Sequence, residues 1–106
     1  MSDCIFCKIV DKLIPAQIIY EDNDFIAFHD IHPKALVHFL IIPKQHIDSM
    51  LQLENIHINL MGKLMILANR LAIEQKLHAG YKVQINTGTN GGQEVFHLHL
   101  HVLGNK

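Results

Sequence analysis

Three histidines near the end of the chain have the spacing best suited to chemistry in this sequence. His97, His99 and His101 alternate with apolar residues. We expect a strand over residues 95–103, and alternate side chains of a strand share one face, roughly 6–7 Å apart. The sequence therefore predicts a row of imidazoles on one face of a strand whose other face is anchored in the core.

An imidazole row of this kind supports three kinds of chemistry, and the sequence alone leaves them open. Two or three histidines can bind zinc or another metal. Ring N–H groups can bind an anion, and a neutral histidine can attack phosphorus as a nucleophile. A polar face on an exposed strand is the fourth interpretation. The preceding glycine-rich stretch, residues 86–92, favours phosphate, because backbone N–H groups in such a loop can approach a ligand closely.

The chain has two cysteines, Cys4 and Cys7, at a spacing that can hold one metal ion from a single helical turn. Residues 1–3 have neither a basic region nor a following apolar run, so no export signal is expected. The longest near-continuous apolar run, residues 37–42, is too short to cross a bilayer. We therefore predict a cytoplasmic protein without membrane partners, in which the cysteine pair is metal-binding or redox-active.

Composition indicates one packed domain over residues 1–106, because 49% of the chain is hydrophobic and 18% is charged. The net charge of −1, with histidines neutral, argues against nucleic acid as a partner. A domain of this size buries only about 60–70% of the surface that its unfolded chain exposes. A bound metal or a second subunit is therefore an expected source of additional stability.

Hydrophobic spacing predicts the elements that position these groups. Gly80 is the expected stop of the longer of two helices. Short connections favour antiparallel pairing, so the predicted fold class is α+β, with an antiparallel sheet of about five strands, one long helix and a short N-terminal helix. The expected helices are residues 4–13 and 54–77, and the expected strands are residues 17–20, 25–28, 37–42, 81–86 and 95–103.

The pattern His-φ-His-φ-His-φ-φ, in which φ is apolar, resembles the signature of the histidine triad (HIT) family. Nearly the whole chain is similar to the Hint-like nucleotide-binding branch, which includes purine nucleoside phosphoramidases. The resemblance implies the HIT-like fold and a homodimer in which the long helix and the strand at residues 81–86 pair across a two-fold axis. The segments that carry it are Cys4-Ile5-Phe6-Cys7-Lys8-Ile9, Ile14-Pro15, Tyr20-Glu21-Asp22, Ala27-Phe28-His29-Asp30-Ile31, Pro33, His38-Phe39-Leu40-Ile41-Ile42-Pro43-Lys44 and Gly91-Gly92-Gln93.

The resemblance implies a hydrolase that cleaves nucleoside 5′-phosphoramidates or acyl-nucleotides. His99 matches the nucleophile, which forms a nucleotidyl-histidine that water converts to a nucleoside monophosphate. His101 matches a residue that contacts phosphate oxygens and the leaving group, so it is the candidate general acid. His97 and His38 complete the polar shell. Asp30 matches a carboxylate that binds both ribose hydroxyls, which implies a preference for ribonucleotides. The resemblance itself implies purine nucleotides, as AMP or GMP conjugates, as the expected ligands.

The remaining substrate-binding residues follow from the same resemblance. Glu94 stands where many relatives carry serine, and a carboxylate beside a phosphate repels it. Glu94 is therefore expected to point away or to bind a leaving-group amine. The apolar members of this set are equally well explained by core packing. The full set is Phe6, Ile9, Ile14, Phe28, Ile31, Asn86, Gln93 and Glu94.

The resemblance also implies a structural zinc site made of Cys4, Cys7, His46 and His97. Four protein ligands leave no open position for water, so the chemistry would need no cofactor, and the zinc would remove His97 from direct catalysis. Three other functions stay open. They are a dinucleoside polyphosphate hydrolase, a non-catalytic nucleotide-binding regulatory partner, and a metallohydrolase that uses the histidine row as ligands.

Overall fold

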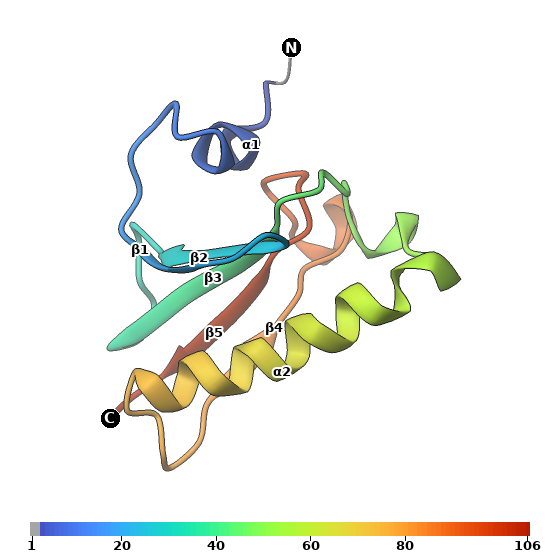
Figure 1. Cartoon of the computed structure of the whole chain (residues 1–106). Coiled ribbons are helices and arrows are strands. Elements are labelled where there is room, and N and C mark those ends of the chain that lie inside the picture. The colour runs from blue at the N-terminus through green and yellow to red at the C-terminus, as the bar shows by residue number, and fades with distance from the viewer. Residues whose placement is uncertain (1–2) are drawn as a thin grey trace.

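A five-stranded antiparallel sheet forms the centre of the molecule, in a computed structural model that describes residues 3–106 (Figure 1). The strand order is β1-β2-β3-β5-β4, so the last strand lies between β3 and β4. The predicted fold class is confirmed. The strands are β1 Ile18–Glu21, β2 Phe25–His29, β3 Val37–Pro43, β4 Lys82–Gln84 and β5 Leu100–Gly104. The helices are α1 Ile5–Val10 and α2 Ile58–Glu74, with 3-10 helices at Met50–Gln52, Asn55–His57 and Thr89–Gly91.

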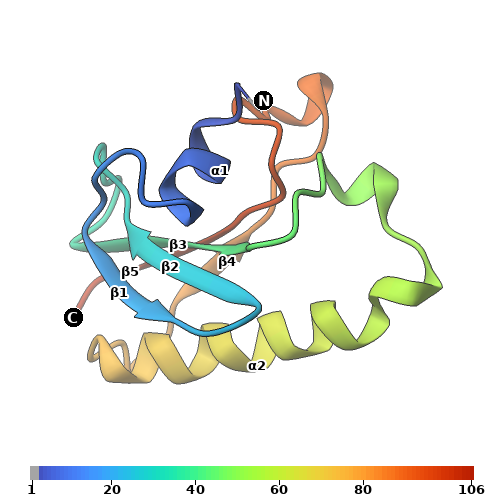
Figure 2. The same cartoon turned by 45° about the horizontal axis from the view of Figure 1, so that its top comes forward.

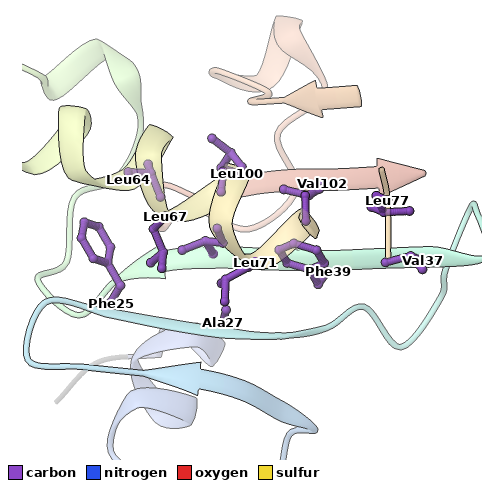
Figure 3. Packing of buried hydrophobic residues seen from close by; sticks show 13 residues of the cluster. Phe25, Ala27, Val37, Phe39, Leu64, Leu67, Leu71, Leu77, Leu100 and Val102 are labelled. Carbon is purple, nitrogen blue, oxygen red and sulfur yellow. The ribbon is translucent and has the colours of Figure 1, made fainter. Parts of the chain in front are cut away.

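The two α-helices lie on opposite faces of the sheet, which separates two hydrophobic cores (Figure 2). Alternation along β3 produces this division: Phe39 and Ile41 belong to the core under α2, whereas Leu40 and Ile42 belong to the core under α1. Every residue of β3 is buried, as expected of a central strand that is covered on both faces. Figure 3 shows the α2 core, which comprises Phe25, Ala27, Val37, Phe39, Ile41, Leu64, Leu67, Ala68, Leu71, Ala72, Leu77, Leu100 and Val102.

The first two strands form the predicted hairpin, and Asp22 explains its turn. The Asp22 Oδ1 atom accepts hydrogen bonds from the backbone N–H groups of Asp24 and Phe25, at 2.7 and 2.8 Å. A carboxylate that satisfies two backbone donors in this way favours a turn over a continued strand. β1 and β2 then pair antiparallel, which directs the following residues towards the candidate site.

Both helices end earlier than predicted, and a lysine in a left-handed conformation follows each of them. α1 ends at Val10, and Lys12 follows with φ of 61°. Lys76, with φ of 72°, takes the left-handed position after α2 that the sequence predicts for Gly80. Leu77, which is 1% exposed, explains the difference. Burying a leucine stabilises by about 1.5–3 kcal/mol, which offsets a left-handed residue that costs roughly 1–2 kcal/mol.

One helical stretch, Asn55–Glu74, is long and apolar enough to cross a membrane by length and composition, with a mean hydropathy of 1.2. The expectation from the sequence considered only near-continuous apolar runs, of which the longest, residues 37–42, is too short to cross a bilayer. The apolar face of α2, with Leu64, Leu67 and Leu71, packs against the sheet as core. That packing accounts for part of the hydropathy of the helix, since 28% of the apolar window is buried.

Candidate functional site

A cavity of about 600 Å³ lies on the α1 side of the sheet. Apolar side chains of α1 and of the segment after it line one part, and polar groups from β3, β4 and β5 line another. A larger groove of about 920 Å³ runs between α2 and the β1–β2 hairpin, but its lining within residues 3–106 has neither histidine nor cysteine. The residues that can do chemistry therefore select the smaller cavity as the candidate site.

Most residues predicted to contact substrate line this cavity. Ile31 is 84% exposed and so lies at its rim. Of the predicted residues, Gln93 and His97 lie outside the lining. The predicted residues that line it are Phe6, Ile9, Ile14, Phe28, Asp30, Ile31, His38, Asn86, Glu94, His99 and His101.

The last strand is shorter than predicted, and this changes how the histidines are held. β5 begins at Leu100, so His97 and His99 lie in irregular backbone before it. The prediction of a regular strand over residues 95–103 is wrong for its first half. Two features of Pro43 explain the break: it has no N–H for the ladder, and its carbonyl accepts the Nε2–H of His97 at 2.7 Å.

His99 has the protonation and placement of a nucleophile. Burial lowers the pKa of His99 below its ordinary value, so the ring is neutral near pH 7. The His99 Nδ1 atom lies 2.7 Å from the carbonyl oxygen of His97, and a carbonyl only accepts, so Nδ1 carries the proton. The Nε2 atom therefore carries the lone pair. The ring is 7% exposed, lines the cavity and lies edge-on to Phe6.

His38 and His101 form a hydrogen-bonded pair beside His99. The Lys34 backbone N–H donates to His38 Nδ1 at 3.1 Å, so the proton of neutral His38 is on Nε2. That Nε2 atom lies 3.0 Å from His101 Nδ1 and 3.4 Å from Asp30 Oδ2. His101 Nδ1 therefore accepts, which leaves the His101 proton on Nε2. Since the His99 and His101 rings are 4.9 Å apart, the cavity offers a lone pair beside an N–H donor.

His101 is not protonated as a general acid must be in the protein without ligand. Burial, followed by the neighbouring rings of His99 and His38, lowers the pKa of His101 to about 4. The ring is therefore neutral near pH 7 in the protein without ligand, and it can donate a hydrogen bond from Nε2–H. An anion in the cavity favours the imidazolium and raises this pKa.

The predicted zinc ligands come together at the start of α1. The ligand atoms of Cys4, Cys7, His46 and His97 all lie within 4.8 Å of one another. The Cys4 and Cys7 Sγ atoms lie 3.3 and 3.5 Å from His97 Nδ1, and Cys7 Sγ lies 3.1 Å from His46 Nδ1. Two sulfurs with two imidazole nitrogens form a donor set of structural zinc sites.

The hydrogen-bond partners at Nε2 of His46 and His97 are compatible with metal binding at Nδ1. The His46 Nε2 atom lies 2.6 Å from Asp48 Oδ1, and the His97 Nε2 atom lies 2.7 Å from the Pro43 carbonyl oxygen. Both partners accept, so both Nε2 atoms carry protons in the neutral rings. The Nδ1 lone pairs therefore point towards the sulfurs, which is the tautomer that metal ligation requires.

A second group of potential ligands, Asp30, His38 and His101, does not have the histidine tautomers that metal ligation requires. Its ligand atoms also lie within 4.8 Å of one another. The Lys34 N–H occupies His38 Nδ1, so the proton of neutral His38 is on the nitrogen that faces the group. This nitrogen has no lone pair for a metal, which disfavours a metallohydrolase at the histidine row.

The polar rim of the cavity includes Asn86 and Glu94. The Asn86 Oδ1 atom accepts from Gln84 Nε2 at 2.8 Å, which orients the amide. Glu94 is exposed and lines the cavity. Its two predicted orientations, pointing away or binding a leaving-group amine, stay predictions.

Gln93 holds the neighbouring loop instead of lining the cavity. Its Oε1 atom accepts from the Gly88 N–H at 2.8 Å, and its Nε2 group donates to the carbonyls of Asp48 and Val95 at 2.7 and 2.9 Å. Gln93 is 5% exposed, so this geometry gives it a structural role in place of the predicted substrate contact.

Sequence reasoning missed three groups that set the protonation of the site. They are the Asp48 carboxylate and the backbone groups of Lys34 and Pro43. Asp48 follows His46 by two residues, and this spacing could have indicated a carboxylate–histidine pair. Backbone donors and acceptors have no signal in residue types, so the other two could not have been found.

Comparisons with known proteins agree with the fold. A family model described as "Scavenger mRNA decapping enzyme C-term binding" matches residues 3–106. Protein HitA of Neisseria gonorrhoeae is 50% identical over 104 residues, which cover 98% of this chain and 97% of that protein. The chain is thus similar to these proteins over almost its whole length.

Solved structures give the same result. A HIT family hydrolase from Legionella pneumophila Philadelphia 1 is 43% identical, with a TM-score of 0.94, covering 96% of this chain and 92% of that one. A Zn-bound histidine triad family protein from Mycobacterium smegmatis is 37% identical, with a TM-score of 0.84, covering 98% of this chain and 76% of that one. The chain belongs to the histidine triad family.

Proposed function

We propose that the chain is a hydrolase that cleaves nucleoside 5′-phosphoramidates or acyl-nucleotides at the α-phosphate through a nucleotidyl-His99 intermediate. The observation that supports this most is the tautomer of His99, whose Nδ1–H is held by the His97 carbonyl while Nε2 carries a lone pair in the cavity. The similar Legionella protein, described as a hydrolase, supports the same reaction class.

The reaction proceeds in two displacements. The Nε2 lone pair of His99 forms a bond to the α-phosphorus, and the bond from phosphorus to the leaving group breaks. The leaving group departs with the electron pair and takes a proton, for which the nearest N–H is on His101. Water then attacks the same phosphorus and gives its proton to His101, which regains the proton lost in the first step, and the bond to Nε2 breaks. The products are a nucleoside monophosphate and the protonated leaving group.

The cavity has separate environments for the parts of a nucleotide. The apolar residues Phe6, Ile9 and Phe28 suit a purine base, and Asp30 is the carboxylate available to ribose hydroxyls. Asp30 Oδ1 already accepts from the His32 N–H at 2.8 Å, which fixes the carboxylate. AMP and GMP conjugates are therefore the proposed ligands.

The proposed cofactor is one structural zinc ion held by Cys4, Cys7, His46 and His97. The tautomers of both histidines and the presence of zinc in the Mycobacterium smegmatis relative support it. Zinc with four protein ligands cross-links the chain and supplies no activated water. The thiolates require a reducing compartment, consistent with the predicted cytoplasmic location. Metal analysis of the purified protein, with Cys4→Ser as the control, tests the site.

A trapping experiment tests the enzymatic proposal. Rapid quenching of the protein with adenosine 5′-phosphoramidate, followed by intact-mass and peptide mass spectrometry, should reveal one nucleotidyl group on His99. His99→Ala should lose turnover and the adduct while still binding AMP. A protein that binds AMP without forming an adduct is a nucleotide-binding regulatory partner. A higher kcat/KM for diadenosine polyphosphates than for phosphoramidates indicates the polyphosphate hydrolase instead.

A homodimer is the proposed assembly, and the edge strand β4 supports it. β4 lies at the edge of the sheet, and all three of its residues are exposed. An unpaired sheet edge of this kind favours association with a second chain. Ile66 and Ile73, 75% and 42% exposed, add apolar surface on α2. Val83→Lys should shift the protein to monomer in sedimentation, because it places like charges across a two-fold axis. Leu13→Lys, at a residue 62% exposed, is the matched control and should stay dimeric.

A further inference from the structure

We propose that the metal site positions the nucleophile, so that metal binding and nucleotide binding are thermodynamically coupled. The inference rests on the proposed function and adds a role for a metal that does not touch the substrate. The four ligands Cys4, Cys7, His46 and His97 all lie outside the cavity lining. Any effect of the metal on the reaction must therefore pass through the chain.

One peptide group connects the two sites. The peptide between His97 and Leu98 donates its N–H to the Ile47 carbonyl at 2.6 Å. The carbonyl of the same peptide accepts the Nδ1–H of His99 at 2.7 Å. Ile47 directly follows the ligand His46, and His97 is itself a ligand. The peptide that fixes the His99 tautomer thus begins at one proposed ligand, His97, and is hydrogen-bonded to the residue that follows another, His46.

The strand pairing of the sheet does not fix this peptide, so its position depends on the Ile47 carbonyl and on side-chain anchors. β5 begins at Leu100, where its ladder with β3 ends. The ring of His97, which is fully buried, is held at Nε2 by the Pro43 carbonyl. At Nδ1 a metal bond would hold it strongly, whereas a thiol is only a weak hydrogen-bond partner. Removing the metal therefore loosens the peptide whose carbonyl holds His99.

The short helix α1 forms a second connection between the sites. α1 has 6 residues, too few for a stable isolated helix, so its position depends on anchors. Cys4 is its N-cap and Cys7 lies within it. Its Phe6 ring contacts the rings of His97 and His99, with centroids 6.1 and 5.1 Å apart. A metal that holds both cysteines to the histidines thus also holds one wall of the cavity.

The coupling predicts that two affinity ratios are equal. If the metal tightens nucleotide binding by some factor, the nucleotide must tighten metal binding by the same factor. Couplings of this kind are typically about 5- to 150-fold. Since the metal here stabilises both the cavity wall and the His99 tautomer, we expect a factor on the order of 10 or more.

The experiment measures both sides of this equality on the wild-type protein. Calorimetry gives the Kd of AMP for the zinc-loaded and the metal-depleted protein, and chelator competition gives zinc affinity with and without AMP. The two ratios should agree at about 10-fold or more. Long-range ¹H–¹⁵N spectra of the His99 ring give a readout that needs no nucleotide. The zinc-loaded protein should show the Nδ1–H tautomer, and the depleted protein a mixture of tautomers.

Two variants outside the cavity separate this coupling from local damage. His46→Asn should weaken zinc binding, weaken AMP binding and shift the His99 tautomer. His78→Asn, at an exposed histidine, is the matched control and should change none of these. If His46→Asn does not fold, Asp48→Asn retains all four ligands and loses only the charged partner of His46. Loss of such a partner typically weakens metal binding by about 10- to 100-fold.

Each outcome of these experiments tests a different part of the proposal. If AMP affinity and the His99 tautomer are the same with and without zinc, the inference is wrong, while the zinc site and the nucleotide function stand. If AMP binds neither form, the proposed function fails, and the His99 spectra alone decide the coupling. A folded wild-type protein that binds no zinc overturns both the zinc site and the coupling.

Discussion

His101 should be neutral down to acidic pH in the ligand-free protein and should titrate near neutrality when AMP is bound. Burial, then the rings of His99 and His38, lower its pKa to about 4. Asp30 and Lys34 act in opposite directions on the same ring. At pH 7 a pKa of about 4 leaves roughly one molecule in a thousand protonated, because each unit is a factor of ten.

A bound phosphate should reverse most of this effect. One negative charge about 4 Å from the ring stabilises the imidazolium by about 4 kcal/mol at an effective dielectric constant of about 20. Since 1.36 kcal/mol is one unit, the pKa of His101 rises by at most about 3, towards 7, because protonating Nδ1 also breaks the hydrogen bond that it accepts from His38 Nε2. A ring with that pKa can hold a phosphate oxygen and protonate a leaving amine at physiological pH.

The measurement is an NMR titration of the histidine Cε1–H signals between pH 5 and 8, with and without AMP. His101→Asn identifies the signal, and exposed His78 serves as the internal reference. Without AMP, the His101 signal should not move in this range, and with AMP it should show a midpoint near 7. A midpoint near 6.5 in the ligand-free protein, or no midpoint with AMP, would refute the electrostatic argument.

Three further predictions concern the same structure. Because folding lowers the pKa of His101 from 6.5 to about 4, its contribution to stability is complete above pH 6.5 and is lost as the pH falls towards 4. In the wild-type protein this gives the free energy of unfolding a slope of up to about 1.4 kcal/mol per pH unit. Urea unfolding at pH 5, 6 and 7 should show that His101→Asn removes this slope. Asp30→Ala should weaken binding of AMP more than of dAMP in calorimetry, and equal weakening would show that Asp30 does not contact the ribose. Leu71→Ala, at a residue 1% exposed, should lower the free energy of unfolding by about 3 kcal/mol, whereas the same change at Leu36, 77% exposed, should stay within about 0.5 kcal/mol.

The fold was largely predictable because its hydrophobic patterns are simple. The run of β-branched and aromatic residues around Phe39 predicts a strand buried on both faces, and the structure has β3 there. The leucines of residues 54–77 predict one long amphipathic helix, and α2 lies inside that range. The ends were less predictable, because Lys76 is left-handed only as a consequence of burying Leu77 in the tertiary core.

The site was predictable in its residue types but not in its backbone. Alternating histidines predict a regular strand, yet β5 begins only at Leu100. The break arises because Pro43 ends the ladder and because its carbonyl binds the ring of His97. A contact between residues 54 positions apart in the chain leaves no local pattern. The row predicted from strand geometry therefore divides into one buried anchor, His97, and two cavity residues, His99 and His101.

The function of each histidine follows from what its second ring nitrogen contacts. His97 donates from Nε2 to a carbonyl, so its Nδ1 lone pair is available to a metal. His99 donates from Nδ1 to a carbonyl, so its Nε2 lone pair is available to phosphorus. His38 accepts at Nδ1 from a backbone N–H, so its Nε2–H orients His101. We propose that these identical side chains serve as ligand, nucleophile and relay because fixed backbone groups select their tautomers. A substitution that moves one of these backbone groups should change the chemistry even when every histidine is retained.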